Sequence, residues 1–91
     1  MRKRYFDTRT LVYFYIVALR RSYRLAAEDL GVTVSALSRP IQELERDLDV
    51  LLFVRGGRHQ TMLTLAGSRF FHKTAETLAM LSEIPRTSDR N

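Results

Sequence analysis

The sequence predicts a mainly α-helical fold with a three-helix core, a two-stranded β hairpin and a long final helix. Three observations favour this fold class. Apolar residues recur at helical spacing in four segments. Residues that cap or end helices stand between these segments. The glycine-containing stretch 55–60 separates two short apolar runs, which is typical of a hairpin.

The first helix is predicted over residues 8–20, after Asp7, a residue type suited to the N-cap position. Its end at Arg20 and Arg21 places positive charge beside the negative end of the helix dipole. The spacing predicts that one face packs into the core through Leu11, Phe14, Ala18 and Leu19.

The second and third helices are separated by Gly31, because glycine readily adopts the positive φ that often ends a helix. Ser22 is suited to cap the second helix, and Thr33 is suited to cap the third. The inward residues expected in the second helix are Ala26, Ala27 and Leu30. The apolar stripe expected on one face of the third helix consists of Leu37, Ile41, Leu44 and Leu48.

The hairpin is predicted from the apolar residues 50–54, the polar tip 55–60 and a return strand over 61–63. Thr64 is suited to cap a fourth helix over residues 65–82. The expected organisation is a domain over 1–64, a linker or dimerisation helix over 65–82 and a disordered polar tail over 83–91.

The chain carries a formal net charge of +5, and 13 of its 15 basic residues are arginine. Arginine presents a planar fork that suits phosphates and the edges of guanine. The positive charge is concentrated in residues 1–41 and 51–75, whereas residues 42–50 are acidic. An anionic partner is therefore expected, with ordinary solvated arginines as the alternative.

The composition argues against several other classes of protein. The chain has no cysteine, so it can form neither a disulfide nor a thiolate metal site. No apolar run reaches the roughly 18 residues of a membrane span, and the N-terminus does not resemble a signal peptide. His59 and His72 lie on different predicted elements, and no catalytic constellation is recognisable. We expect a cytoplasmic, nucleoid-associated protein that is not an enzyme and binds no metal, cofactor or membrane.

The second and third helices, joined by a glycine turn, have the form that insertion into the major groove of double-stranded DNA requires. The polar face in the first half of the third helix consists of Thr33, Ser35, Ser38, Arg39 and Gln42. The acidic residues of its second half, which would repel phosphates, are Glu43, Glu45, Asp47 and Asp49. The N-terminal end is therefore the predicted reading end. Together with the hairpin as a wing, this arrangement predicts a winged helix-turn-helix.

The wing supplies two further candidate contacts. Arg58, at the tip of the hairpin, is expected to reach an adjacent minor groove. Arg55 is expected to contact the flanking phosphates.

Six fragments of the chain keep a recognisable order and spacing. They are SYRLAA (22–27), LGVT (30–33), ALSR (36–39) with Ile41, LE (44–45), LFVRGGR (52–58) and LTLAG (63–67). Through them the chain resembles the N-terminal DNA-binding region of LysR-type transcriptional regulators over roughly residues 7–80. The resemblance implies a winged helix-turn-helix followed by a linker helix, through which such regulators dimerise and bind two half-sites.

The resemblance also implies roles for single residues. Ser38 and Arg39 stand where such regulators contact bases and phosphates, and Arg58 stands where they present a wing arginine. Thr33 matches a serine or threonine that caps the reading helix or contacts a phosphate. Arg24 lies near the edge that contacts the DNA backbone, with a structural role as the alternative.

The chain departs from the family pattern at several positions. Val34 and Ser35 replace the usual Gln-Pro, so a bidentate adenine contact is lost and a preference shifted toward thymine is expected. Pro40 removes a helix hydrogen bond at a cost on the order of 3 kcal/mol, which predicts a kink or an early break. Asp49 replaces the usual glycine ahead of the wing. The family's effector-binding region has no counterpart, so we expect no small-molecule effector to act on this chain.

The final helix carries more large apolar residues than one face of a small domain is expected to bury. These residues are Phe70, Phe71, Leu78 and Leu81. We interpret the surplus as a homodimer interface, and the alternative is that these residues complete the core.

Three functions remain open at this point. The favoured one is a sequence-specific transcriptional regulator, a homodimer without its own ligand-sensing domain that acts by occupying its site or with a second transcription factor. The second is a protein-interaction module that pairs with other regulators, which Pro40 and Val34 favour. The third is a nonspecific or architectural DNA binder, which the basic segment 2–4 favours.

Overall fold

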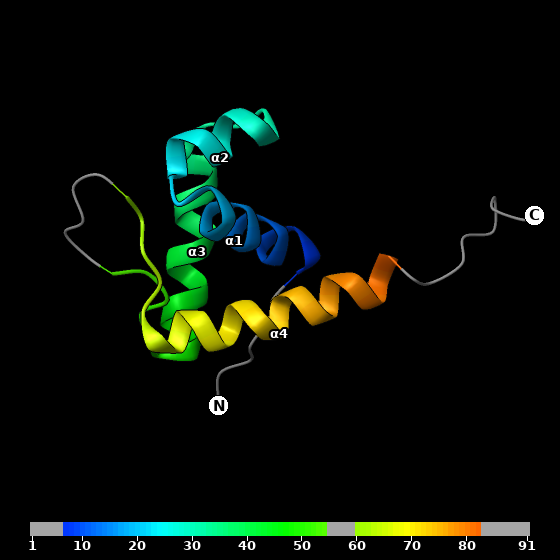
Figure 1. Ribbon diagram of the computed structural model, residues 1–91. Coiled ribbons are helices and arrows are strands. Elements are labelled where there is room, and N and C mark those ends of the chain that lie inside the picture. Colours follow the sequence, from blue (N-terminus) through cyan, green and yellow to red (C-terminus); the bar gives the residue numbers. More distant parts are fainter. Residues whose placement is uncertain (1–6, 55–59, 83–91) are drawn as a thin grey trace, which may run out of the picture.

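The computed structural model describes residues 7–54 and 60–82. The helices in these residues are α1 (Thr8–Arg20), α2 (Tyr23–Leu30), α3 (Val34–Leu48) and α4 (Leu65–Ser82). Helix α1 lies at the centre and contacts α2, α3 and α4, and α2 also packs on α3 (Figure 1). The basic segment 2–4, the hairpin tip and the polar tail fall outside the described residues.

The predicted caps are confirmed at the start of all four helices. Each capping oxygen accepts a hydrogen bond from a backbone N–H of the first turn, at 2.9 Å for Asp7, 3.0 Å for Ser22, 3.1 Å for Thr33 and 2.9 Å for Thr64. The N–H donated by Thr10 holds the pKa of the Asp7 carboxyl below its usual value. Because each of these bonds spans only three residues, the helix starts are set by local sequence.

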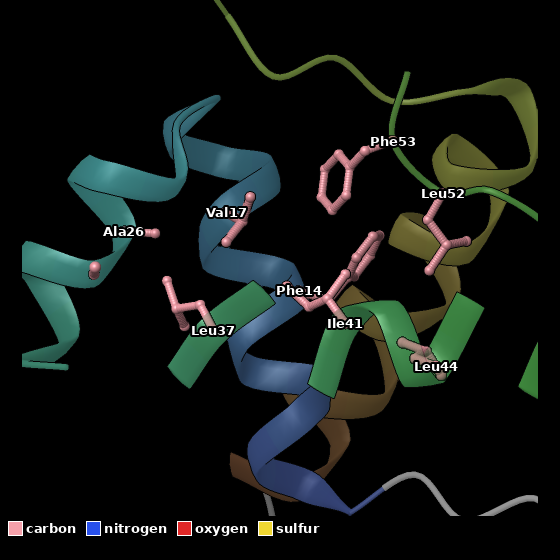
Figure 2. Packing of buried hydrophobic residues seen from close by; sticks show 9 residues of the cluster. Phe14, Val17, Ala26, Leu37, Ile41, Leu44, Leu52 and Phe53 are labelled. Carbon is pink, nitrogen blue, oxygen red and sulfur yellow. The ribbon is translucent and has the colours of Figure 1, made fainter. Parts of the chain in front are cut away.

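The core joins the three helices of the bundle to the hairpin. Its buried apolar residues are Phe14, Val17, Ala26, Ala27, Leu37, Ile41, Leu44, Leu52 and Phe53. Figure 2 shows these side chains converging from α1, α2, α3 and the hairpin. The ring of Phe14 lies 5.3 Å from that of Phe53 and 5.2 Å from that of Phe70, so it connects α1 to the hairpin and to α4.

The prediction that Leu19 belongs to the core is wrong. Its side chain is 53% exposed, whereas Val17 is fully buried. Successive residues of a helix are about 100° apart, so Val17 lies about 60° from Phe14 around the axis and Leu19 about 140° from it. Ala18 packs against the core as expected.

The predicted early break at Pro40 is also wrong, because α3 continues through this residue to Leu48. Leu37 and Ile41, on either side of Pro40, are both fully buried and hold the two halves of the helix against the core. The carbonyl that loses its hydrogen bond belongs to Ala36, an exposed residue, so water can replace the missing partner. The packing of the apolar stripe therefore offsets the cost of the proline.

The turn after α3 keeps the geometry that a glycine would provide. Asp49 adopts a left-handed conformation with φ 59° and ψ 38°, and its N–H bonds to the carbonyls of Arg46 and Glu45. Gly31 ends α2 in the same region, with φ 69°, as predicted. The replacement of glycine by Asp49 therefore preserves the path of the chain toward the wing, at the cost of a left-handed backbone for a residue with a Cβ.

The base of the wing is held by few backbone hydrogen bonds. An antiparallel bridge pairs Phe53 with Leu63, and the described residues form no longer ladder around it. The N–H of Val54 donates to Met62 at 2.7 Å, and the N–H of Thr61 donates to Arg21 at 3.0 Å. The second of these bonds attaches the wing to the loop between α1 and α2.

Replacing Asp49 by glycine is expected to raise the free energy of unfolding by roughly 0.5–1 kcal/mol, because glycine adopts the left-handed conformation without a Cβ clash. Urea denaturation followed by circular dichroism measures the change. The matched control is Asp49→Ala, which removes the same charge but keeps a Cβ at positive φ. An equal gain in both variants would show that the charge of Asp49, and not its backbone, limits stability.

Candidate nucleic-acid interface

The predicted reading face lies on the first half of α3 and is open to solvent. Ser35, Arg39 and Gln42 follow one another at helical spacing and are all exposed. Val34, at the start of the helix, is 44% exposed, and Ser38 is half-buried. Thr33 uses its side chain to cap α3. The structure therefore brings the six candidate DNA-binding residues of α3 and its cap to the N-terminal end of the helix.

Arg46 is a further basic residue on this side that sequence reasoning did not select. It is exposed and lies seven residues after Arg39, two helical turns further along the same face. Arg46 was not selected because it is the one basic residue among four acidic residues in the segment 42–50. Helical spacing counted from Arg39 is the signal that could have identified it.

Arg24, the candidate on α2, takes part in an ion pair. Its guanidinium donates to the carboxylate of Glu28 at 2.9 Å, and both side chains are largely exposed. A pair of this kind on a helix surface contributes little to stability and exchanges readily with another anion. The contact with Glu28 is therefore compatible with both roles considered for Arg24, a contact with the DNA backbone and a structural role.

Glu45 does not belong to the acidic surface of α3 to which the sequence assigned it. Only 6% of this residue is exposed. Its Oε2 atom accepts hydrogen bonds from the backbone N–H groups of Leu52, at 2.7 Å, and Phe53, at 3.2 Å. This carboxylate thus joins the reading helix to the first strand of the wing.

The wing arginines Arg55 and Arg58 lie outside the described residues. The N–H of Val54 donates to the carbonyl of Met62, and these two residues are the hydrogen-bonded pair nearest the tip within the described part of the hairpin. The assignment of these arginines to phosphate and minor-groove contacts stays a prediction.

The four candidate dimer residues of α4 occupy different environments. Phe70 packs edge-on against Phe14. Phe71 stacks on Tyr15, with ring centroids 5.1 Å apart and planes 7° from parallel. Leu78 is half-buried and Leu81 is 45% exposed, near the end of a helix whose last turns project past α1 (Figure 1). The two phenylalanines therefore contribute to the packing of this chain, whereas Leu81 leaves apolar surface exposed near the end of α4.

None of the helices within the described residues is both long and apolar enough to cross a membrane.

A three-helix core, a reading helix with an exposed polar N-terminal half and a hairpin held against that helix define a winged helix-turn-helix DNA-binding domain. The profile of the bacterial regulatory helix-turn-helix proteins of the lysR family matches residues 8–68. The chain belongs to the LysR family and carries the DNA-binding domain of a transcriptional regulator of that type.

Two relatives illustrate the similarity in sequence. The chain is 38% identical over 84 residues to the HTH-type transcriptional regulator IlvR of Caulobacter vibrioides, covering 92% of this chain and 28% of that protein. It is 41% identical over 73 residues to a probable RuBisCO transcriptional regulator of Porphyra purpurea, covering 80% of this chain and 23% of that protein. The chain thus spans about a quarter of the length of these relatives.

Two solved structures are similar in fold, and both contain DNA. The complex of the BenM DNA-binding domain with catB site 1 DNA superposes with a TM-score of 0.82 at 32% identity, covering 86% of both chains. The complex of the CbnR DNA-binding domain with DNA superposes with a TM-score of 0.79 at 32% identity, covering 85% of this chain and 87% of that chain.

Replacing Glu45 by alanine is expected to lower the free energy of unfolding by roughly 2–4 kcal/mol, because two backbone N–H groups lose their acceptor in a buried site. Glu45→Gln retains an oxygen acceptor and is expected to cost less than half as much. Urea denaturation measures both changes. The matched control is Glu43→Ala, an exposed position on the same helix that is expected to stay within about 0.5 kcal/mol of the wild type.

Equal stability of the Glu45→Ala and Glu43→Ala variants would contradict the assignment of the carboxylate as the connection between α3 and the wing.

Proposed function

We propose that this chain binds double-stranded DNA sequence-specifically by inserting the first half of α3 into the major groove. The observation that carries the proposal is the exposed stripe of Ser35, Arg39 and Gln42 at the capped end of α3. Short side chains around Arg39 allow the helix backbone to approach the base edges, and its guanidinium can form two parallel hydrogen bonds to guanine. No acidic residue interrupts residues 33–42. The DNA complexes of the similar domains support DNA binding by this chain.

The roles of the neighbouring residues follow from their chemistry. Ser38 and Val34 are proposed to contact base edges, because an exposed valine favours the methyl group of thymine over a hydrogen-bonding edge and a serine hydroxyl can hydrogen-bond to a base. Arg24 on α2 and Arg46, two turns beyond Arg39 on α3, are proposed to contact phosphates, which position the domain without reading sequence. Arg55 and Arg58 are proposed to extend the footprint through the wing.

We further propose that the chain acts as a homodimer that pairs through the end of α4. Leu78 and Leu81 continue the face of α4 that packs on α1, but α4 extends past α1 and leaves Leu81 and Met80 exposed. A second copy that covers this overhang would place two reading helices on adjacent half-sites, as the two-fold symmetry of many operators requires. The proposal assigns DNA reading and pairing to this chain.

Replacing Arg39 by alanine is expected to weaken binding to the selected sequence by roughly 1–3 kcal/mol and to relax the base preference at one position of each half-site. Competitive selection from a genomic fragment library at near-physiological salt measures both effects. The matched control is Arg9→Ala, an exposed arginine at the start of α1 that removes the same charge. Enrichment of the same motif by wild type and Arg39→Ala would show that α3 is not the reader.

Binding without any enriched motif in the wild type would indicate a nonspecific DNA binder and would contradict the proposal. A two-fold symmetric motif supports the homodimer.

Replacing Leu81 by lysine is expected to raise the dimer dissociation constant about tenfold or more, because a charged side chain would be buried in an apolar contact. Sedimentation velocity over a range of concentrations measures the change. Leu65→Lys is the control, since Leu65 is 71% exposed at the opposite end of the same helix. A dimer that is equally stable in both variants would show that the end of α4 is not the interface.

A further inference from the structure

An apolar groove of about 360 Å³ lies between the end of α3 and the first half of α4. The apolar residues that line it are Leu48, Val50, Leu52, Ala66 and Phe70. Leu48 is the last residue of α3, whereas the reading face begins at its first. Leu48 lies about 120° around the helix axis from Gln42 and about 160° from Arg46, so the groove opens on a different side of α3 from the exposed polar stripe.

Two basic residues of α4 complete the lining of the groove. Arg69 and Lys73 are both exposed, and they lie at helical spacing with Ala66 and Phe70 on one face of α4. Neither forms an ion pair within residues 7–54 and 60–82. The charged side chains that line the groove are therefore both cationic. The groove thus combines an apolar floor with two available positive charges.

We infer that this groove binds an acidic amphipathic segment of a partner protein, with an apolar side chain in the groove and carboxylates on Arg69 and Lys73. The apolar floor does not suit the phosphate backbone of DNA, which favours polar and charged contacts. The pairing proposed above uses the end of α4, whereas the groove adjoins its first half, so a second copy of this chain in the groove is an alternative that the test below distinguishes. An amphipathic acidic segment satisfies both the apolar and the charged parts of the site.

The position of the groove separates the partner segment from the DNA. Since it lies at the opposite end of α3 from the reading face, the partner segment and DNA occupy different surfaces of the domain. Both can therefore be bound at the same time. The site would let a DNA-bound domain recruit a second protein.

The test uses the full chain and two labelled synthetic peptides in fluorescence anisotropy. Both peptides form a short amphipathic helix with leucines on one face, and the other face carries glutamates in one peptide and lysines in the other. The glutamate peptide is expected to bind the wild type, and Lys73→Glu is expected to weaken this binding about tenfold and to improve binding of the lysine peptide. Arg9→Glu, which changes the net charge equally outside the groove, is expected to leave both affinities within about twofold.

Three results would overturn the inference. In the first, wild type, Lys73→Glu and Arg9→Glu bind the glutamate peptide equally, or none of them binds it. In the second, DNA displaces the peptide, which would place both on one surface. In the third, Lys73→Glu shifts the sedimentation of the chain toward monomer, which would show that a second copy covers the groove. Unchanged thermal unfolding of Lys73→Glu confirms that the variant is folded.

Discussion

The side chain of Glu45 joins α3 to the base of the wing, the two parts of this domain that are proposed to face DNA. A helix that enters a groove and a wing that reaches beside it can act together only if their relative position is constrained. The described wing has a single antiparallel bridge, which is too short to set its own orientation. Glu45 supplies the constraint, because one oxygen of its side chain binds the N–H groups of both Leu52 and Phe53. The buried oxygen is stabilised in this site because it accepts hydrogen bonds from two N–H donors.

The same strand is held from its other side by α4. A Cβ at Gly67 would lie 1.9 Å from the carbonyl oxygen of Leu52, so only glycine allows α4 to approach the backbone this closely. Thr64, one turn earlier, donates its N–H to the same carbonyl. The backbone of Leu52 is therefore the point at which the reading helix, the wing and the final helix meet. A shift of α4 would be transmitted to the base of the wing through this contact.

The charges of the domain are distributed along α3 in a way that separates two kinds of contact. The capped end presents Arg39 among short polar side chains, and the other end carries Asp47 and Asp49. The groove with Arg69 and Lys73 adjoins this acidic end but belongs to α4. A polyanion such as DNA is therefore attracted to one end of α3, while the groove presents its cations on a different element. One small core thus supports two surfaces of different chemistry.

The sequence by itself determined the order and the limits of the helices and the polar face in the first half of α3. The caps, the left-handed Gly31 after α2 and the polar face around Arg39 depend on residues within a few positions of one another, so local spacing reveals them. Tertiary structure alone decided which groups are buried. It exposed Leu19, placed Phe70 and Phe71 against α1, kept α3 continuous at Pro40 and turned Glu45 from a surface acid into a link to the wing. These outcomes depend on segments far apart in the chain, whose approach no local pattern specifies.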